Sequence, residues 1–109
     1  MLFFGIACRV TCRVVDTAVA GCLFADVIVG DGRYELNQLD DQYDVITIDA
    51  YKVPYIPWHL TTQEFFEEVQ AHLAEDGVVA INVGRAPEDR TLIEAMTATM
   101  QTVFPTIHT

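Results

Sequence analysis

The sequence predicts a single α/β domain with a mostly parallel sheet, and the main sign of it is a recurring short apolar run. Such runs lie at residues 26–31 (DVIVGD), 43–49 (YDVITID) and 77–83 (GVVAINV), with a weaker candidate at 11–16 (TCRVVD). β-branched runs of this length, bounded by turn residues, are typical of strands buried on both faces of a parallel sheet. Helical patterns follow two of them, and strands that alternate with helices build parallel sheets through right-handed crossovers.

Two helices are predicted after the second and third strands. The first begins at a capping box formed by Thr61 and Glu64, and we expect Gly77 to end it. The second begins near Pro87 and ends at Pro105, which cannot continue a helix. Each helix carries one apolar stripe: Phe65, Phe66, Val69 and Leu73 in the first, and Leu92, Ile93, Met96, Met100, Val103 and Phe104 in the second.

Length, composition and charge limit the classes of partner. The chain has 109 residues, 51% of them hydrophobic, which fits one domain with a real core. Six Lys and Arg stand against sixteen Asp and Glu, giving a formal net charge of −10. This balance argues against binding to a nucleic-acid backbone or an anionic membrane surface, and it is compatible with a cationic small-molecule substrate.

The cysteines and the opening residues point to the cytoplasm. Cys8, Cys12 and Cys22 form no Cys-x-x-Cys pair, so they indicate neither a disulfide framework nor a zinc site and are expected to be buried thiols. Residues 1–8 are apolar, but no basic residues precede them, and Arg9 soon interrupts the run. We therefore expect neither a signal peptide nor a membrane span.

Ligands of open α/β sheets bind at the carboxyl ends of the strands, so the residues there are the candidates for function. Asp31 and Gly32 end the first clear strand; a carboxylate can accept from an exocyclic amine, and glycine lets the backbone approach a flat ring. An ordinary strand-to-loop turn explains Asp-Gly equally simply, and on spacing alone we favour the turn.

Asp49 ends the next strand and could serve as a general base, as an anchor for an ammonium group, or as a cap of the following turn. Residues 51–60 after it hold two tyrosines, a tryptophan, two prolines and a histidine. Loops of this kind often close over ligands, although packing alone also explains them. His59 could be an acid or base or a structural histidine, and we expect His72 to face solvent.

Several motifs are missing from the sequence. No cluster of His, Cys and Asp has metal-ligand spacing, so no metal is predicted. No Gly-x-Ser-x-Gly motif or Cys/His pairing supports covalent catalysis. The Gly-x-Gly-x-x-Gly turn that normally opens a nucleotide-binding α/β half is also absent, and Gly5 stands alone.

From about residue 25 to residue 109 the chain resembles the spermidine synthase (polyamine aminopropyltransferase) family, within the Rossmann-like group of S-adenosylmethionine-dependent methyltransferases. The matching segments, in order, are residues 29–33 (VGDGR), 43–46 (YDVI) leading to Asp49, 60–66 (LTTQEFF), 73–78 (LAEDGV) and 103–105 (VFP). The resemblance implies part of a Rossmann-like three-layer sandwich with a mostly parallel sheet, truncated at its N-terminal side.

The resemblance also implies roles for individual residues. Asp31 and Gly32 would hold the adenine of decarboxylated S-adenosylmethionine, or of S-adenosylmethionine itself. Asp49 would contribute to the same adenosyl site and act on the attacking amine as base or orienting group. Residues 51–60 would gate the substrate cleft, with Tyr51, Lys52 and Tyr55 as the substrate loop. The products would be an aminopropylated amine and methylthioadenosine.

Departures from the family pattern leave alternatives open. Lys52 stands where polyamine synthases usually have a second Asp, and like charges would oppose a diamine there. The usual glutamine after the next strand corresponds to Asn82 or a neighbour, and the ribose-binding acid to Asp16 or Val14. The sequence therefore predicts a cytoplasmic, spermidine synthase-like transferase. The alternatives are a methyltransferase and a catalytically inactive fragment or interaction module. Its partners would be an amine or methyl acceptor and, through an exposed sheet edge, a second copy in a homodimer.

Overall fold

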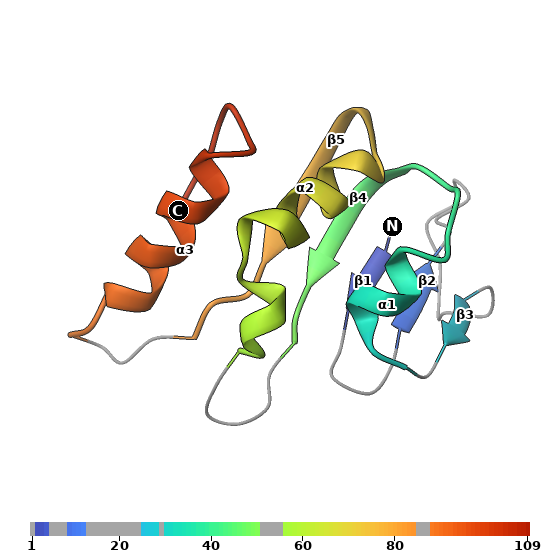
Figure 1. Cartoon of the computed structure of the whole chain (residues 1–109), viewed down its shortest axis with the longest axis horizontal. Coiled ribbons are helices and arrows are strands. Elements are labelled where there is room, and N and C mark those ends of the chain that lie inside the picture. Colours follow the sequence, from blue (N-terminus) through green and yellow to red (C-terminus); the bar gives the residue numbers. More distant parts are fainter. Residues whose placement is uncertain (1, 5–8, 13–24, 29, 51–55, 85–87) are drawn as a thin grey trace, which may run out of the picture.

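The computed structural model describes most of the chain, including the strand-end residues Asp31, Asp49 and Asn82 (Figure 1). The described residues are 2–4, 9–12, 25–28, 30–50, 56–84 and 88–109, with side chains from residue 30 onward. The structural statements that follow concern these residues.

Five strands form one sheet in the order β3-β2-β1-β4-β5. They are β1 (Leu2–Phe4), β2 (Arg9–Cys12), β3 (Ala25–Ile28), β4 (Tyr43–Ile48) and β5 (Leu73–Ile81). β4 pairs in parallel with β1 and with β5, whereas β2 is antiparallel to both β1 and β3. β2 alone therefore runs backwards, and the other four strands point their carboxyl ends to one edge.

The reversed β2 follows from chain length. Only residues 5–8 separate β1 from β2, and a parallel pair needs a crossover of roughly a dozen residues or more. The strand predicted over 26–31 is found as β3, but its sheet partner is antiparallel, which corrects the expected parallel environment. The candidate strand at 11–16 overlaps β2 at Thr11 and Cys12, and its remainder lies outside the described residues.

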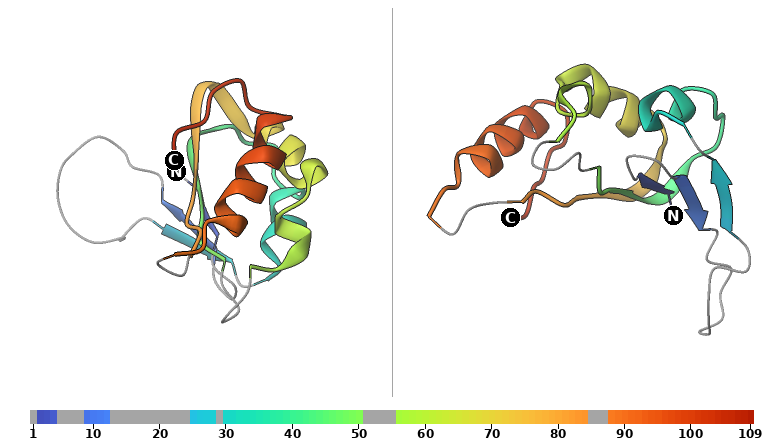
Figure 2. Two further views of the ribbon diagram at one scale, coloured as in Figure 1. Left: turned by 90° about the vertical axis from the view of Figure 1, so that its left-hand side faces the viewer. Right: turned by 90° about the horizontal axis from the view of Figure 1, so that it is seen from below.

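The described helices cover one face of the sheet (Figure 2). They are α1 (Gly32–Leu36), the short 3₁₀ helix η1 (Trp58–Leu60), α2 (Gln63–Ala71) and α3 (Thr91–Gln101). Between these helices and the sheet lies one apolar core whose largest fully buried side chains are Leu36, Ile46, Ile48, Phe65, Phe66 and Val69. The α/β class is confirmed, with two of the three layers of a sandwich in the described residues.

The apolar stripes place the helices against this core. In α2, Phe65, Phe66 and Val69 are all buried, as their spacing predicts. Leu73, the fourth residue of that predicted stripe, lies in β5 and not in the helix. In α3 the buried residues are Met96 and Met100, whereas Leu92 remains 42% exposed. α3 begins at Thr91 and not near Pro87, so Leu92 falls in the first turn, at the end of the helix away from the buried methionines.

The prediction that Gly77 ends the first helix is wrong. α2 ends at Ala71, and Gly77 lies inside β5, where the pairing with β4 is irregular. A Cβ at this position would come within 2.9 Å of the backbone oxygen of Tyr43. Real Cβ atoms essentially never approach so closely, so the glycine permits contact between two backbones.

The prediction of a solvent-facing His72 is also wrong. His72 caps the end of α2 and is half-buried. Its Nδ1 lies 2.8 Å from the backbone oxygen of Glu68, and its Nε2 lies 3.0 Å from that of Leu39. The ring therefore ties the end of α2 to the segment between α1 and β4.

We expected the strands to be buried on both faces of the sheet, but β5 exposes side chains on one of them. Along β5 the side chains alternate: Val79 and Ile81 pack against the core, while Val78 is 59% exposed and Ala80 is exposed. β5 is also the last strand of the sheet, so this exposed face adjoins an open edge. The side chains of Cys8, Cys12 and Cys22 lie outside the described set.

Candidate functional site

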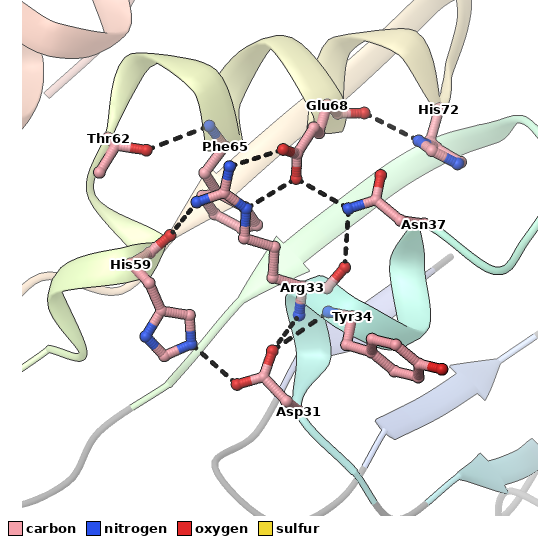
Figure 3. Close-up of polar contacts among 9 residues, drawn as sticks. All are labelled: Asp31, Arg33, Tyr34, Asn37, His59, Thr62, Phe65, Glu68 and His72. Atoms are coloured by element: carbon pink, nitrogen blue, oxygen red, sulfur yellow. Dashed lines mark hydrogen bonds and ion pairs between the residues drawn. The ribbon is translucent and has the colours of Figure 1, made fainter.

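Asp31 follows β3 and begins α1, and both of its carboxylate oxygens are in use (Figure 3). Oδ1 accepts hydrogen bonds from the backbone N–H groups of Arg33 and Tyr34, each at 3.1 Å. Oδ2 lies 2.8 Å from Nε2 of His59. The strand-to-loop turn favoured on spacing is replaced by the start of a helix, because Asp31 is the N-cap of α1 and Gly32 is its first residue.

These contacts keep Asp31 ionised. Burial acts to raise the pKa of Asp31, but the hydrogen bonds from Tyr34 N–H, His59 and Arg33 N–H, with the attraction of His59, outweigh it and lower that pKa below its usual value. The Asp31 side chain remains 51% exposed, so the carboxylate is accessible from solvent. An accessible carboxylate is suited to accept hydrogen bonds from a ligand.

His59 belongs to η1 and is attached to the strand end at two points. Its side chain contacts Asp31, and its backbone oxygen accepts a hydrogen bond from Nη1 of Arg33 at 2.9 Å. Trp58 beside it is 78% exposed, and its ring meets the His59 ring edge-on with centroids 5.9 Å apart. The end of the predicted substrate loop is therefore fixed against the start of α1.

Arg33 connects this point to α2. Its Nε and Nη2 donate to the two carboxylate oxygens of Glu68, at 2.8 and 2.5 Å, and Glu68 Oε2 also accepts from Asn37 Nδ2 at 2.9 Å. We call the set of Arg33, Asn37, His59 and Glu68 the Arg33 clamp. The hydrogen bond to Glu68 raises the pKa of Arg33, and the same bond lowers the pKa of Glu68. Arg33 is thus occupied within the protein and is not a free anion-binding group.

Asp49 lies at the carboxyl end of β4, where β5 also ends. Asn82 Nδ2 donates to Asp49 Oδ1 at 3.1 Å, and Asn82 N–H donates to the Ile48 oxygen at 2.9 Å. Asp49 is half-buried. The sequence placed Asn82 near this position, and the structure adds a direct contact that orients the carboxylate.

A groove of about 940 Å³ opens between β5 and α3. Asn82 and Val83 line it at the strand end, and further along its wall is mostly apolar, with Ile81 of β5 and Met96 and Met100 of α3. Through Asn82 the groove adjoins the Asp49 side of the sheet edge.

Asp31 and Asp49 lie at the same edge but follow separate strands, β3 and β4. β3 and β4 are three positions apart in the sheet, which corresponds to about 14 Å at the usual spacing of strands. The two carboxylates would contact one ligand only if that ligand extended along the edge.

Some expected site residues fall outside the described part of the chain. Tyr51, Lys52 and Tyr55, as well as Asp16 and Val14, belong to this group. In the part that is described, no three His, Cys, Asp or Glu side chains are placed to hold a metal ion. None of the helices seen there is long and apolar enough to cross a membrane.

Sequence reasoning missed the Arg33 clamp. Arg33 is the only cation between Arg13 and Lys52 in a strongly acidic chain, which is a signal that it pairs with a carboxylate. Nothing in the sequence selects Glu68, which is 35 residues away, over the other acidic residues.

The order of these strand ends matches a known family. The model of the spermine/spermidine synthase domain matches residues 24–109, which is most of the chain and includes Asp31, Asp49 and the whole Arg33 clamp. The chain belongs to the spermine/spermidine synthase family. The resemblance stated from the sequence is thereby confirmed, with nearly the same starting residue.

Two curated members of the spermine/spermidine synthase family are similar to the chain. A probable polyamine aminopropyl transferase of Bifidobacterium longum is 39% identical over 75 residues, and a polyamine aminopropyltransferase of Vibrio vulnificus is 33% identical over 81 residues. These matches cover 68% and 72% of the chain but only 17% and 26% of the relatives. The chain therefore spans about a quarter or less of the proteins it matches. No solved structure matches it significantly.

Proposed function

We propose that this chain forms the adenosyl-binding and amine-activating edge of a polyamine aminopropyltransferase-like enzyme. The observation that carries the proposal is the placement of Asp31 and Asp49 at one edge of the sheet, each held by a neighbouring side chain. The cofactor is decarboxylated S-adenosylmethionine, which supplies an aminopropyl group from a sulfonium centre.

The contacts of Asp31 fit an adenine amine. An ionised carboxylate offers roughly four acceptor positions. Two backbone N–H groups occupy Oδ1 and His59 occupies one position on Oδ2, so, counting contacts with the described residues, one position on Oδ2 remains. The exocyclic amine of adenine can donate one N–H to that position without breaking the helix cap. Gly32, next in the chain, adds no side chain at this point.

Asp49 fits the other end of an extended adenosyl ligand. In aminopropyl transfer the amine nitrogen forms a bond to the carbon next to the sulfonium, the C–S bond breaks, and its electron pair stays on the sulfur of methylthioadenosine. The amine loses a proton in the process. Asn82 donates to Asp49 Oδ1, and no other described residue is recorded on Oδ2, which would orient the amine and accept that proton. The apolar groove beside Asn82 suits the aliphatic chain of an amine.

Methyl transfer is a second candidate because of Lys52. By the resemblance, Lys52 stands where polyamine synthases usually have a second Asp, so its positive charge would oppose the second ammonium group of a diamine. A methyl acceptor without that charge avoids the repulsion, while the adenosyl site would be unchanged.

Turnover assays decide between the two reactions. The chain is incubated with an amine and either cofactor, and the product is identified by mass. An increase by one aminopropyl group supports the proposal, and an increase by one methyl group supports the second candidate. Asp49→Asn should abolish either product, whereas Asp40→Asn, an exposed carboxylate in a loop, is the matched control. No product with either cofactor from the folded chain would reject both reactions.

A further inference from the structure

His59 holds the one carboxylate that the proposed function assigns to the adenine, and the hydrogen bond has a definite direction. Asp31 is ionised and can only accept, so the proton must lie on Nε2 of His59. The histidine itself is fixed, because Arg33 binds its backbone oxygen and Glu68 holds Arg33. Both partners of the contact are therefore held in place: Asp31 by the backbone N–H groups of α1, and His59 through Arg33 and Glu68.

We propose that His59 is a positioning residue that, among the described contacts of Asp31, leaves this carboxylate a single acceptor position and so restricts the site to ligands that present one N–H donor. This inference rests on the proposed function and explains why the Asp31 site would select an adenine amine over other donors. With His59 in place, a vicinal diol or a guanidinium group, which donates two hydrogen bonds to one carboxylate, would have to displace the histidine. A base amine does not.

The geometry also explains why the histidine aids binding of such a ligand. Two bonds to Oδ1 hold the carboxylate but allow it to tilt about that oxygen, and the bond from His59 to Oδ2 fixes the second oxygen. A fixed acceptor need not be ordered when the ligand arrives, which lowers the entropic cost of binding.

The test combines three ligands with three proteins. The ligands are methylthioadenosine, its N6-methyl derivative, which keeps one N–H, and its N6,N6-dimethyl derivative, which has none. The proteins are the unaltered full chain, His59→Phe, which keeps a ring but has no donor, and His59→Gln, which keeps a donor near the position of Nε2. Dissociation constants come from calorimetry, and circular dichroism checks that each variant is folded.

For the unaltered chain, the first two ligands should bind within about threefold of one another and the dimethyl derivative at least tenfold more weakly. His59→Phe should weaken binding of methylthioadenosine about tenfold and leave the dimethyl derivative unchanged, because only the amine uses the fixed oxygen. His59→Gln should restore the affinity to within about threefold. A merely structural role would weaken all ligands alike and would not be rescued.

Three outcomes overturn the inference. Equal losses for the amine and the dimethyl ligand in His59→Phe, or no loss at all, contradict it while the proposed function stands. Failure of the N6-methyl derivative to bind contradicts the single-donor requirement. If the folded, unaltered chain does not bind methylthioadenosine, the proposed function fails and this inference fails with it.

Discussion

Removing the guanidinium of the Arg33 clamp should destabilise the fold by about 2 kcal/mol. Arg33→Met keeps most of the aliphatic stem but deletes two hydrogen bonds to Glu68 and one to the His59 oxygen. An exposed pair contributes at most about 1 kcal/mol and a broken buried pair costs about 3–5 kcal/mol. The side chains of Arg33 and Glu68 are 24% and 28% exposed, which places this pair between the two limits.

Urea unfolding followed by circular dichroism measures this cost directly, and a thermal scan should show a fall in Tm of about 10 °C for a domain of this size. Glu68→Gln should cost about half as much, because the amide oxygen still accepts from Arg33. Glu75→Gln removes an exposed charge from β5 and is the matched control. If Arg33→Met is no more destabilising than that control, Arg33 does not join α1 to α2 as described.

Three further predictions concern stability. Gly77→Ala should lower the free energy of unfolding in urea by about 1–3 kcal/mol, because its Cβ would meet the Tyr43 backbone oxygen at 2.9 Å. An unchanged free energy of unfolding would contradict this close approach of β5 to β4. Thr62→Ala removes the cap of α2 and should cost about 1 kcal/mol, which Thr62→Ser should restore. Glu68 has a lowered pKa in the fold, so its stabilisation is present above the ordinary glutamate pKa of about 4.5 and is lost as the pH falls through the folded pKa. Arg33→Met should flatten this acid-side loss in unfolding curves measured between pH 3 and 6, and an unchanged slope would contradict the assignment.

The elements that a local sequence pattern encodes were predicted correctly. The run at 43–49 is β4 to within one residue, and three of the four residues predicted as the apolar stripe of the first helix are buried in α2. The prediction for Gly77 was wrong because glycine is common both at helix ends and where two backbones approach closely, and only the tertiary structure distinguishes the two cases. The antiparallel pairing of β1 with β2 was missed for a similar reason, because the sequence between them carries no strong turn signal.

The sequence predicted where the candidate site residues lie in the fold, but not which side chains they contact. Asp31 and Asp49 lie at strand ends because the alternating pattern puts polar residues there, so topology alone predicts their shared edge. The pairing of Asp31 with His59 and of Arg33 with Glu68 joins residues 28 and 35 positions apart. Such pairings depend on how η1 and α2 pack over the sheet, which no local motif encodes.

A calorimetric titration of the full chain with methylthioadenosine, repeated on Asp31→Asn, shows whether the adenosyl group binds at Asp31. Asparagine keeps the helix cap, because its Oδ1 still accepts from the backbone, but replaces the remaining acceptor with a donor. The account predicts micromolar binding by the unaltered chain and a loss of at least tenfold in the variant. A folded chain that does not bind, or a variant that binds equally well, would contradict the assignment of the adenosyl group to this edge of the sheet.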